Sequence, residues 1–143
     1  MAADTGAAVW TGGCLCGHVR YRTTGTPLRP HYCHCRMCQQ ATGGPFAALV
    51  GFDRGSFEWT GAEPKRYRSS SLAQRGFCGE CGTPLTYERE GAAHVSVTIP
   101  SLDRPDAIPP QAHWGVESRL SWPKIDDGLP GERTEDVAPS TPS

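Results

Sequence analysis

Residues 77–85 read Phe-Cys-Gly-Glu-Cys-Gly-Thr-Pro-Leu, and they hold the most informative motif of the chain. Cys78 and Cys81 stand two residues apart, and a glycine follows each of them. Such a pair can offer two thiolates from one tight turn to a zinc ion, which takes four ligands with sulfur at about 2.3 Å. Glycine adopts the left-handed backbone conformation that a chelating turn often needs. The stretch therefore predicts half of a closed zinc site.

The other five cysteines lie on the N-terminal side of this stretch, again in short-spaced groups. The simplest division joins the pair Cys14 and Cys16 to the pair Cys78 and Cys81, which gives a structural site with four sulfurs. Three cysteines then remain for a second zinc with one open position, which is typical of a catalytic rather than a structural zinc. The predicted ligands are Cys14, Cys16, Cys78 and Cys81 for the structural zinc, and Cys33, Cys35 and Cys38 for the catalytic one.

Other arrangements stay open on spacing alone. Some of the middle cysteines can join Cys78 and Cys81, leaving Cys14 and Cys16 as an incidental pair. Four cysteines can also hold an iron–sulfur cluster. Buried free thiols are a weaker interpretation, because such cysteines scatter through a sequence. We favour zinc, with two ions per chain.

The composition indicates one small domain that needs a disulfide or a metal ion to stabilise it. The chain has 143 residues, 37% of them hydrophobic, with 17 glycines and 13 prolines. This length suits a single core, and the glycine and proline content favours many turns and short strands. A thin core of this kind often depends on a disulfide or a metal.

The net charge and the number of cysteines limit which binding partners and which cellular compartment are expected. The net charge is −1, which gives no long-range attraction to nucleic acid or to an anionic membrane. No stretch approaches the ~20 apolar residues that span a bilayer. The N-terminus lacks the basic and apolar regions of a signal peptide, so we expect a cytoplasmic protein. Seven cysteines cannot all pair internally, which again favours metal over disulfides.

Short alternating or apolar runs between turn residues predict an antiparallel, mainly β domain with one short helix at most. Residues 26–30 are expected to form a connection. Residues 1–9 are expected to be a loose leader, 10–130 the zinc-binding domain, and 131–143 a disordered tail. The expected strands are 16–23, 46–52, 57–59, 65–68, 73–77, 85–89 and 94–99, and the expected helix is 35–42.

Three thiolates would give a zinc ion a net charge of −1, making it a poor activator of water. A thiol that binds there would lose its proton and keep much of its nucleophilicity. Chemistry on a sulfur substrate is therefore the natural prediction.

Three segments with the right neighbours carry a resemblance to a known family. Gly13-Cys-Leu-Cys-Gly17, Tyr32-Cys-His-Cys-Arg-Met-Cys-Gln39 and residues 77–85 resemble the glutathione-dependent formaldehyde-activating enzymes, a family that includes centromere protein V-like proteins. The segment from His113-Trp114 to Pro130 is similar to the C-terminal end of that family.

The resemblance implies a β-tent fold related to zinc ribbons and the same division of the cysteines. It also implies a carbon–sulfur lyase that joins formaldehyde to glutathione, giving S-hydroxymethylglutathione. In that picture the thiolate of glutathione takes the open position and attacks the aldehyde. The alternatives are a zinc-scaffolded binding module without catalysis and a thiol or metal sensor that uses the three-sulfur site.

Several other residues are candidates for minor roles. His31 is able to close the open position, which would leave the protein purely structural. His34 is expected to point away from the metal. Some polar residues can line a pocket or bind the carboxylates of a substrate, although solvent exposure is the simpler interpretation. These residues are Gln39, Gln40, Lys65, Arg66 and Arg68. His113 and Trp114 can form an aromatic wall beside a substrate.

Overall fold

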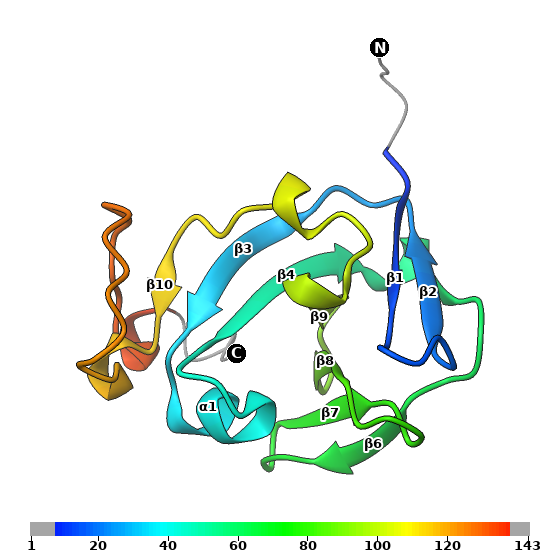
Figure 1. Ribbon diagram of the computed structural model, residues 1–143, viewed down its shortest axis with the longest axis horizontal. Coiled ribbons are helices and arrows are strands. Elements are labelled where there is room, and N and C mark those ends of the chain that lie inside the picture. Colours follow the sequence, from blue (N-terminus) through cyan, green and yellow to red (C-terminus); the bar gives the residue numbers. More distant parts are fainter. Residues whose placement is uncertain (1–7, 138–143) are drawn as a thin grey trace.

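The protein, described by a computed structural model over residues 8–137, is mainly β, as predicted (Figure 1). Ten strands form two sheets, and one short α-helix accompanies them within these residues. The strands are β1 (Trp10–Gly13), β2 (Arg20–Thr23), β3 (Leu28–Cys33), β4 (Ala47–Asp53), β5 (Phe57–Trp59), β6 (Lys65–Arg68), β7 (Ala73–Phe77), β8 (Pro84–Arg89), β9 (His94–Thr98) and β10 (His113–Trp114), and the helix is α1 (Arg36–Thr42). Single-turn 3-10 helices lie at Arg54–Ser56, Ile99–Ser101, Pro105–Ala107, Val116–Ser118 and Thr134–Asp136.

The smaller sheet has the order β1-β2-β5 and the larger one the order β10-β3-β4-β9-β8-β7-β6. All pairs are antiparallel except β10 and β3, which run parallel. In Figure 1, β1 and β2 stand on one side of the molecule, while β6 and β7 lie below β3 and β4, with α1 at the lower left. The turn after β1 and the turn after β7 are thereby brought together from different sheets.

The main core fills the space between the two sheets. Tyr21 from the small sheet and Phe52 and Leu85 from the large sheet are fully buried in one cluster. The hydroxyl of Tyr21 lies 2.6 Å from that of Ser101, so its polar end is satisfied. Burial of each large apolar side chain stabilises the fold by about 1.5–3 kcal/mol.

One predicted connection is wrong. Residues 26–30 were expected to form a link, but β3 begins at Leu28 and continues through Pro30. The register of β3 against β4 shifts between Leu28 and His31, and Arg29 in this interval has a φ of 47°. Proline is tolerated in a strand at such an irregularity because its missing N–H is not needed there.

The predicted domain limits fall partly outside the described residues. Of the expected leader, residues 1–7 lie outside them, as do residues 138–143 of the expected tail. Between these limits, the backbone N–H of Glu132 donates to the carbonyl of His113 at 2.9 Å, and that of Thr134 donates to Glu117 at 2.9 Å. In residues 8–137, no helix has both the length and the apolar character needed to cross a membrane.

Candidate metal centres

The seven cysteine sulfurs are gathered into two groups, and within each group all sulfurs lie within 4.8 Å of one another. All seven are free thiols. The grouping that would join the middle cysteines to Cys78 and Cys81 does not occur. We call the groups the four-cysteine cluster, formed by Cys14, Cys16, Cys78 and Cys81, and the three-cysteine cluster, formed by Cys33, Cys35 and Cys38.

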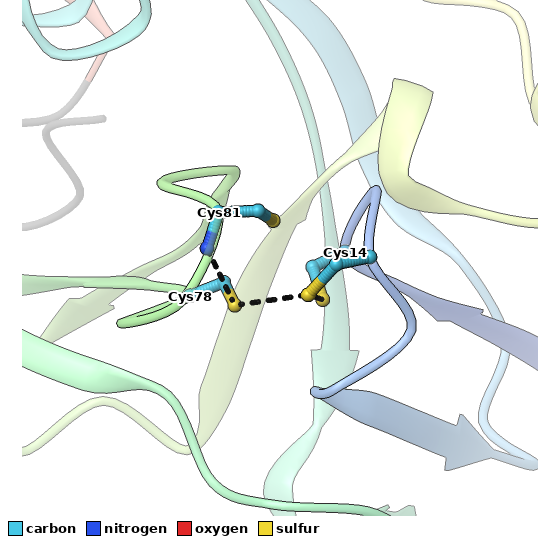
Figure 2. Close-up of side chains that lie close together, drawn as sticks. Cys14, Cys78 and Cys81 are labelled. Atoms are coloured by element: carbon cyan, nitrogen blue, oxygen red, sulfur yellow. Dashed lines mark hydrogen bonds between the residues drawn. The ribbon is translucent and has the colours of Figure 1, made fainter.

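The four-cysteine cluster is made by two tight turns that face each other, one after β1 and one after β7. Figure 2 shows the side chains of Cys14 and Cys78 pointing toward one another from these turns. Backbone N–H groups donate to the sulfurs: that of Val19 to Cys14 at 3.2 Å, and those of Glu80 and Cys81 to Cys78 at 3.3 and 3.4 Å. Such donors stabilise thiolate over thiol, as expected of metal-binding turns.

Both turns depend on glycine. Gly17 has a φ of 82° and Gly82 a φ of 84°, a region that side chains with a Cβ rarely adopt. The hydroxyl of Thr83 joins the two turns, because it accepts from the backbone N–H of Leu15 at 3.1 Å and lies 3.1 Å from the sulfur of Cys81. This contact with Thr83 is the main reason that the pKa of Cys81 is lowered to about 5.

The distances in the four-cysteine cluster suit a tetrahedral metal. The sulfur of Cys16 lies 3.6 Å from that of Cys14 and 3.8 Å from that of Cys78. A zinc ion with four sulfurs at about 2.3 Å places each pair of sulfurs about 3.8 Å apart. A donor set of thiols alone favours zinc or another thiophilic metal.

The three-cysteine cluster lies in one continuous segment, at the end of β3 and the start of α1. The sulfur of Cys35 accepts from the backbone N–H of Cys38 at 3.4 Å and so caps the helix. Cys33 and Cys38 are buried and pack against Ala47 and Leu49 of β4. This cluster is therefore deeper in the molecule than the four-cysteine cluster, in which Cys16 and Cys81 are exposed.

No histidine or carboxylate among residues 8–137 joins the three sulfurs as a fourth donor within the same span. His31, the residue able to close the site, stacks its ring on Trp114 with 3.7 Å between the centroids. Its Nδ1 lies 2.7 Å from the carbonyl oxygen of Arg29. His31 is not among the donors grouped with the three sulfurs.

A buried arginine accompanies the three thiols. Nη2 of Arg75, on β7, donates to the sulfur of Cys38 at 3.6 Å. The pKa of Cys35 is lowered to about 2, first by hydrogen bonds from Cys33 and Cys38, and in smaller part by the charge of Arg75. The pKa of Cys33 is raised, first by its hydrogen bond to Cys35, and the pKa of Cys38 is raised to about 11, so without a metal the cluster favours a single thiolate.

Sequence reasoning missed Arg75. The signal was its place in β7: every second residue of this strand faces the interior, and Arg75 has the same parity as the buried Ala73. An arginine at a buried position of a strand is unusual and points to a local function.

A chain of hydrogen bonds runs behind the three-cysteine cluster. Nε2 of His34 lies 2.9 Å from Nδ1 of His113, and Nε2 of His113 lies 3.1 Å from both carboxylate oxygens of Asp127. If His113 donates to Asp127, its Nδ1 accepts, so His34 donates through Nε2. Burial lowers the pKa of His34 to about 4, which keeps this ring neutral. His34 thus points away from the sulfurs, as the sequence predicted.

The remaining candidates have structural contacts. Gln39 is buried, and its side-chain N–H donates to the carbonyls of His34 and Ser118 at 2.8 and 3.0 Å. Gln40 is exposed, as are Lys65 and Arg68, and Arg68 pairs with Glu90. Arg66 pairs with the buried carboxylate of Glu88, while His113 and Trp114 are both buried and so form no exposed wall.

Comparisons with known proteins agree with this arrangement. The family model of the glutathione-dependent formaldehyde-activating enzyme matches residues 9–118. A protein of Schizosaccharomyces pombe named an uncharacterized lyase is 31% identical over 78 residues, which cover 54% of this chain and 56% of that protein. The match thus spans little more than half of the relative.

A crystal structure of a Rhodobacter sphaeroides protein has a similar fold. The two structures superpose with a TM-score of 0.54 at 19% identity, over 85% of this chain and 99% of that one. At this identity the likeness concerns the fold alone.

Proposed function

The chain belongs to the glutathione-dependent formaldehyde-activating enzyme family, and on this premise we propose that it is a zinc-dependent carbon–sulfur lyase. It joins a thiol such as glutathione to a small aldehyde such as formaldehyde at the three-cysteine cluster. The single observation that carries the proposal is the contrast between four grouped thiols in one cluster and three, with no fourth protein donor among residues 8–137, in the other.

Two zinc ions per chain are the proposed cofactors. The four-cysteine cluster holds the structural ion and ties the two sheets together, because its two turns come from different sheets. The three-cysteine cluster holds the catalytic ion, with Cys33, Cys35 and Cys38 as ligands. A zinc ion held by these three cysteines would supply a Lewis acid that lowers the pKa of an incoming thiol and leaves it nucleophilic.

The residues around the three-cysteine cluster supply positive charge and a fixed backbone, which favour binding of an anionic substrate. Arg75 is buried beside Cys38, and its positive charge offsets part of the charge of the thiolates. Gln39 holds the carbonyl of His34 between two of the cysteines, which fixes the backbone of this segment. The partners are therefore small molecules, a thiol and an aldehyde, in a reducing compartment such as the cytoplasm, where free thiols persist.

Cobalt substitution tests the proposal directly. We expect purified protein to bind one metal ion at each of the two clusters, and glutathione to change the visible spectrum of cobalt at the three-cysteine cluster. S-methylglutathione, which has no free thiol, is the matched control and should leave the spectrum unchanged. Cys35→Ser should abolish the response to glutathione.

The catalytic part is measured separately, as the rate at which glutathione and formaldehyde form their adduct, because the two also combine without an enzyme. Acceleration by the zinc-loaded protein, lost in Cys35→Ser, is the expected result. An unchanged cobalt spectrum at millimolar glutathione, or an iron–sulfur absorption spectrum, would contradict the proposal that the protein is a zinc-dependent lyase. A metal-bound protein without either response would be a binding module.

A further inference from the structure

A cavity of about 320 Å³ lies beside the three-cysteine cluster. Its walls are mostly apolar and come from α1, β4, β6, β7 and β8, with Leu49, Tyr67, Phe77 and Pro84 among them. Leu49 also packs against the buried cysteines, so one wall of the cavity is shared with the cluster. We call this space the Arg75 cavity, since Arg75 is its only charged lining residue among the described residues.

The hydrogen-bonding capacity of Arg75 is not exhausted by the protein. Its side chain is 5% exposed, its Nη2 reaches Cys38, and its guanidinium carbon lies 4.9 Å from the ring centroid of Tyr87. Its Nε is buried and has no hydrogen-bond partner, and within residues 8–137 no carboxylate pairs with it. A buried donor without an acceptor is costly. The Arg75 side chain also lines the cavity, so an oxygen atom placed there can accept a hydrogen bond from the part of the guanidinium that reaches this space.

A second cavity of about 580 Å³ adjoins the first, and we call it the outer cavity. The two cavities share Thr42, Ala47, Pro84 and Thr98 in their walls. The outer cavity also contains Arg20 and Asp103, so it is the more polar of the two. Cys14 also lines the outer cavity, so this space lies beside the four-cysteine cluster, and the Arg75 cavity is the one next to the three-cysteine cluster.

The size of the Arg75 cavity exceeds what formaldehyde needs. A water molecule occupies about 30 Å³ in the liquid, and formaldehyde adds only one heavy atom to that size. A one-carbon aldehyde would leave most of an apolar space of about 320 Å³ without contacts. An aldehyde with an apolar substituent of several carbons would fill it.

Resting on the proposed function, we propose that the Arg75 cavity binds an aldehyde with a bulky apolar substituent, and that Arg75 donates a hydrogen bond to its carbonyl oxygen. The substituent lies against Leu49, Tyr67 and Phe77, and the carbonyl group lies at the Arg75 side of the cavity, where Arg75 contacts Cys38.

The assigned step balances without a further reactant. The sulfur of the thiolate forms a bond to the carbonyl carbon, and the π electrons of the C=O bond move to the oxygen. Arg75 stabilises the resulting oxyanion through its N–H donors but keeps its own protons, because a guanidinium does not lose them in a protein. The oxyanion then takes from water a proton equivalent to the one that the thiol released, giving the hemithioacetal.

Binding of unreactive carbonyl compounds to the zinc-loaded protein tests the inference without turnover. Phenylacetamide and formamide serve as probes, because amides do not react with thiols under these conditions. We expect phenylacetamide to bind at least tenfold more tightly than formamide in a titration calorimeter, because only its ring fills the apolar space. Arg75→Met should weaken the binding of both amides at least tenfold, because both offer the same carbonyl oxygen. Arg22→Met, on the exposed face of the small sheet, is the matched control and should bind as the unchanged protein does.

A second variant keeps the test decisive if Arg75→Met fails to fold or loses metal. Ala41 lines the cavity at the end of α1 and is no part of either cluster, so Ala41→Phe should fill the space and weaken phenylacetamide binding at least tenfold. Ala93→Phe at an exposed position is its control. Equal binding of both amides, or unchanged binding in Ala41→Phe, would overturn the inference.

Rates with two aldehydes distinguish this failure from failure of the proposed function. Acceleration of the reaction of glutathione with phenylacetaldehyde, reduced at least tenfold by Ala41→Phe, supports the inference. Acceleration with formaldehyde alone overturns the inference and leaves the proposed function intact. Acceleration with neither aldehyde overturns both.

Discussion

The four-cysteine and three-cysteine clusters use the same side chain in opposite surroundings. The four-cysteine cluster joins two turns from different sheets and has two exposed cysteines, yet its four donors are sufficient for a closed site. The three-cysteine cluster comes from one segment, is more deeply buried, and has a buried cation and an apolar cavity beside it. Burial therefore does not mark the structural site in this protein. The number of donors and the presence of adjoining space distinguish the two clusters.

The largest expected effect compares loss of one ligand from each cluster. Cys78→Ser should lower the free energy of unfolding by more than about 4 kcal/mol, because it removes the link between the sheets. Cys35→Ser should cost less than about 2 kcal/mol while its metal is lost, because the core stays intact. Denaturant unfolding together with metal content measures both. Equal destabilisation by the two changes would remove the distinction between the clusters.

A pair of glycines with left-handed backbone gives the next effect. A Cβ on Gly115, at a φ of 69°, would lie 2.9 Å from the backbone nitrogen of Cys35, whereas one on Gly17, at a φ of 82°, would meet nothing within 4 Å. Gly17→Ala should therefore cost about 1–2 kcal/mol through backbone strain alone. Gly115→Ala should cost about 1–3 kcal/mol more through the clash.

The cobalt spectra of the two variants locate the damage. Gly115→Ala should alter the spectrum of the three-cysteine cluster, and Gly17→Ala should leave that cluster unchanged. If the two glycine variants were equally stable, the packing of Gly115 against Cys35 would have no role in holding the cluster.

A smaller effect depends on pH. Burial lowers the pKa of His31 to about 4 from its usual 6.5, so between these values the unfolded chain binds a proton that the folded chain does not. Its contribution to stability is complete above pH 6.5 and is lost as the pH falls toward 4. In His31→Phe, which retains a ring to stack on Trp114, the free energy of unfolding should fall less steeply over this range, by at most about 1.4 kcal/mol per pH unit.

The control for this change is His18→Gln, because His18 is exposed. Protonation of the thiolates steepens the acid limb of every variant alike, so the comparison concerns the difference in slope. Identical slopes for His31→Phe and the unchanged protein would mean that His31 is not held neutral in the fold.

The smallest effect concerns Thr83, which joins the two turns of the four-cysteine cluster. Thr83→Val removes the acceptor for the N–H of Leu15 and the contact that lowers the pKa of Cys81, and should cost about 1–2 kcal/mol. The pH at which half of the metal leaves the four-cysteine cluster should rise, while the three-cysteine cluster should be unaffected. Thr60→Val at an exposed position is the control. Equal shifts at both clusters would show that they are not independent.

Part of the fold followed directly from local pattern. The strands Phe57–Trp59, Lys65–Arg68 and Ala73–Phe77 have the predicted limits. A short run of alternating side chains between turn residues is typical of a β-strand. β3 was missed because Pro30 is unfavourable in a regular strand, and only pairing with β4 reveals the irregularity that accommodates it. β10 has two residues and exists because β3 offers a free edge, which no local pattern can indicate.

Residue types and their spacing were enough to predict the chemistry: seven thiols at short spacings, with glycines where the turns need them, indicate a metal-binding, mainly β protein. Tertiary structure alone decided which thiols meet, because the turns after β1 and β7 become neighbours only when the two sheets pack. It also placed Arg75 beside Cys38 and left a cavity there. The physical reason is that residue type and spacing fix local donor geometry, whereas burial, charge pairing and enclosed space are properties of chain segments that are distant in the sequence.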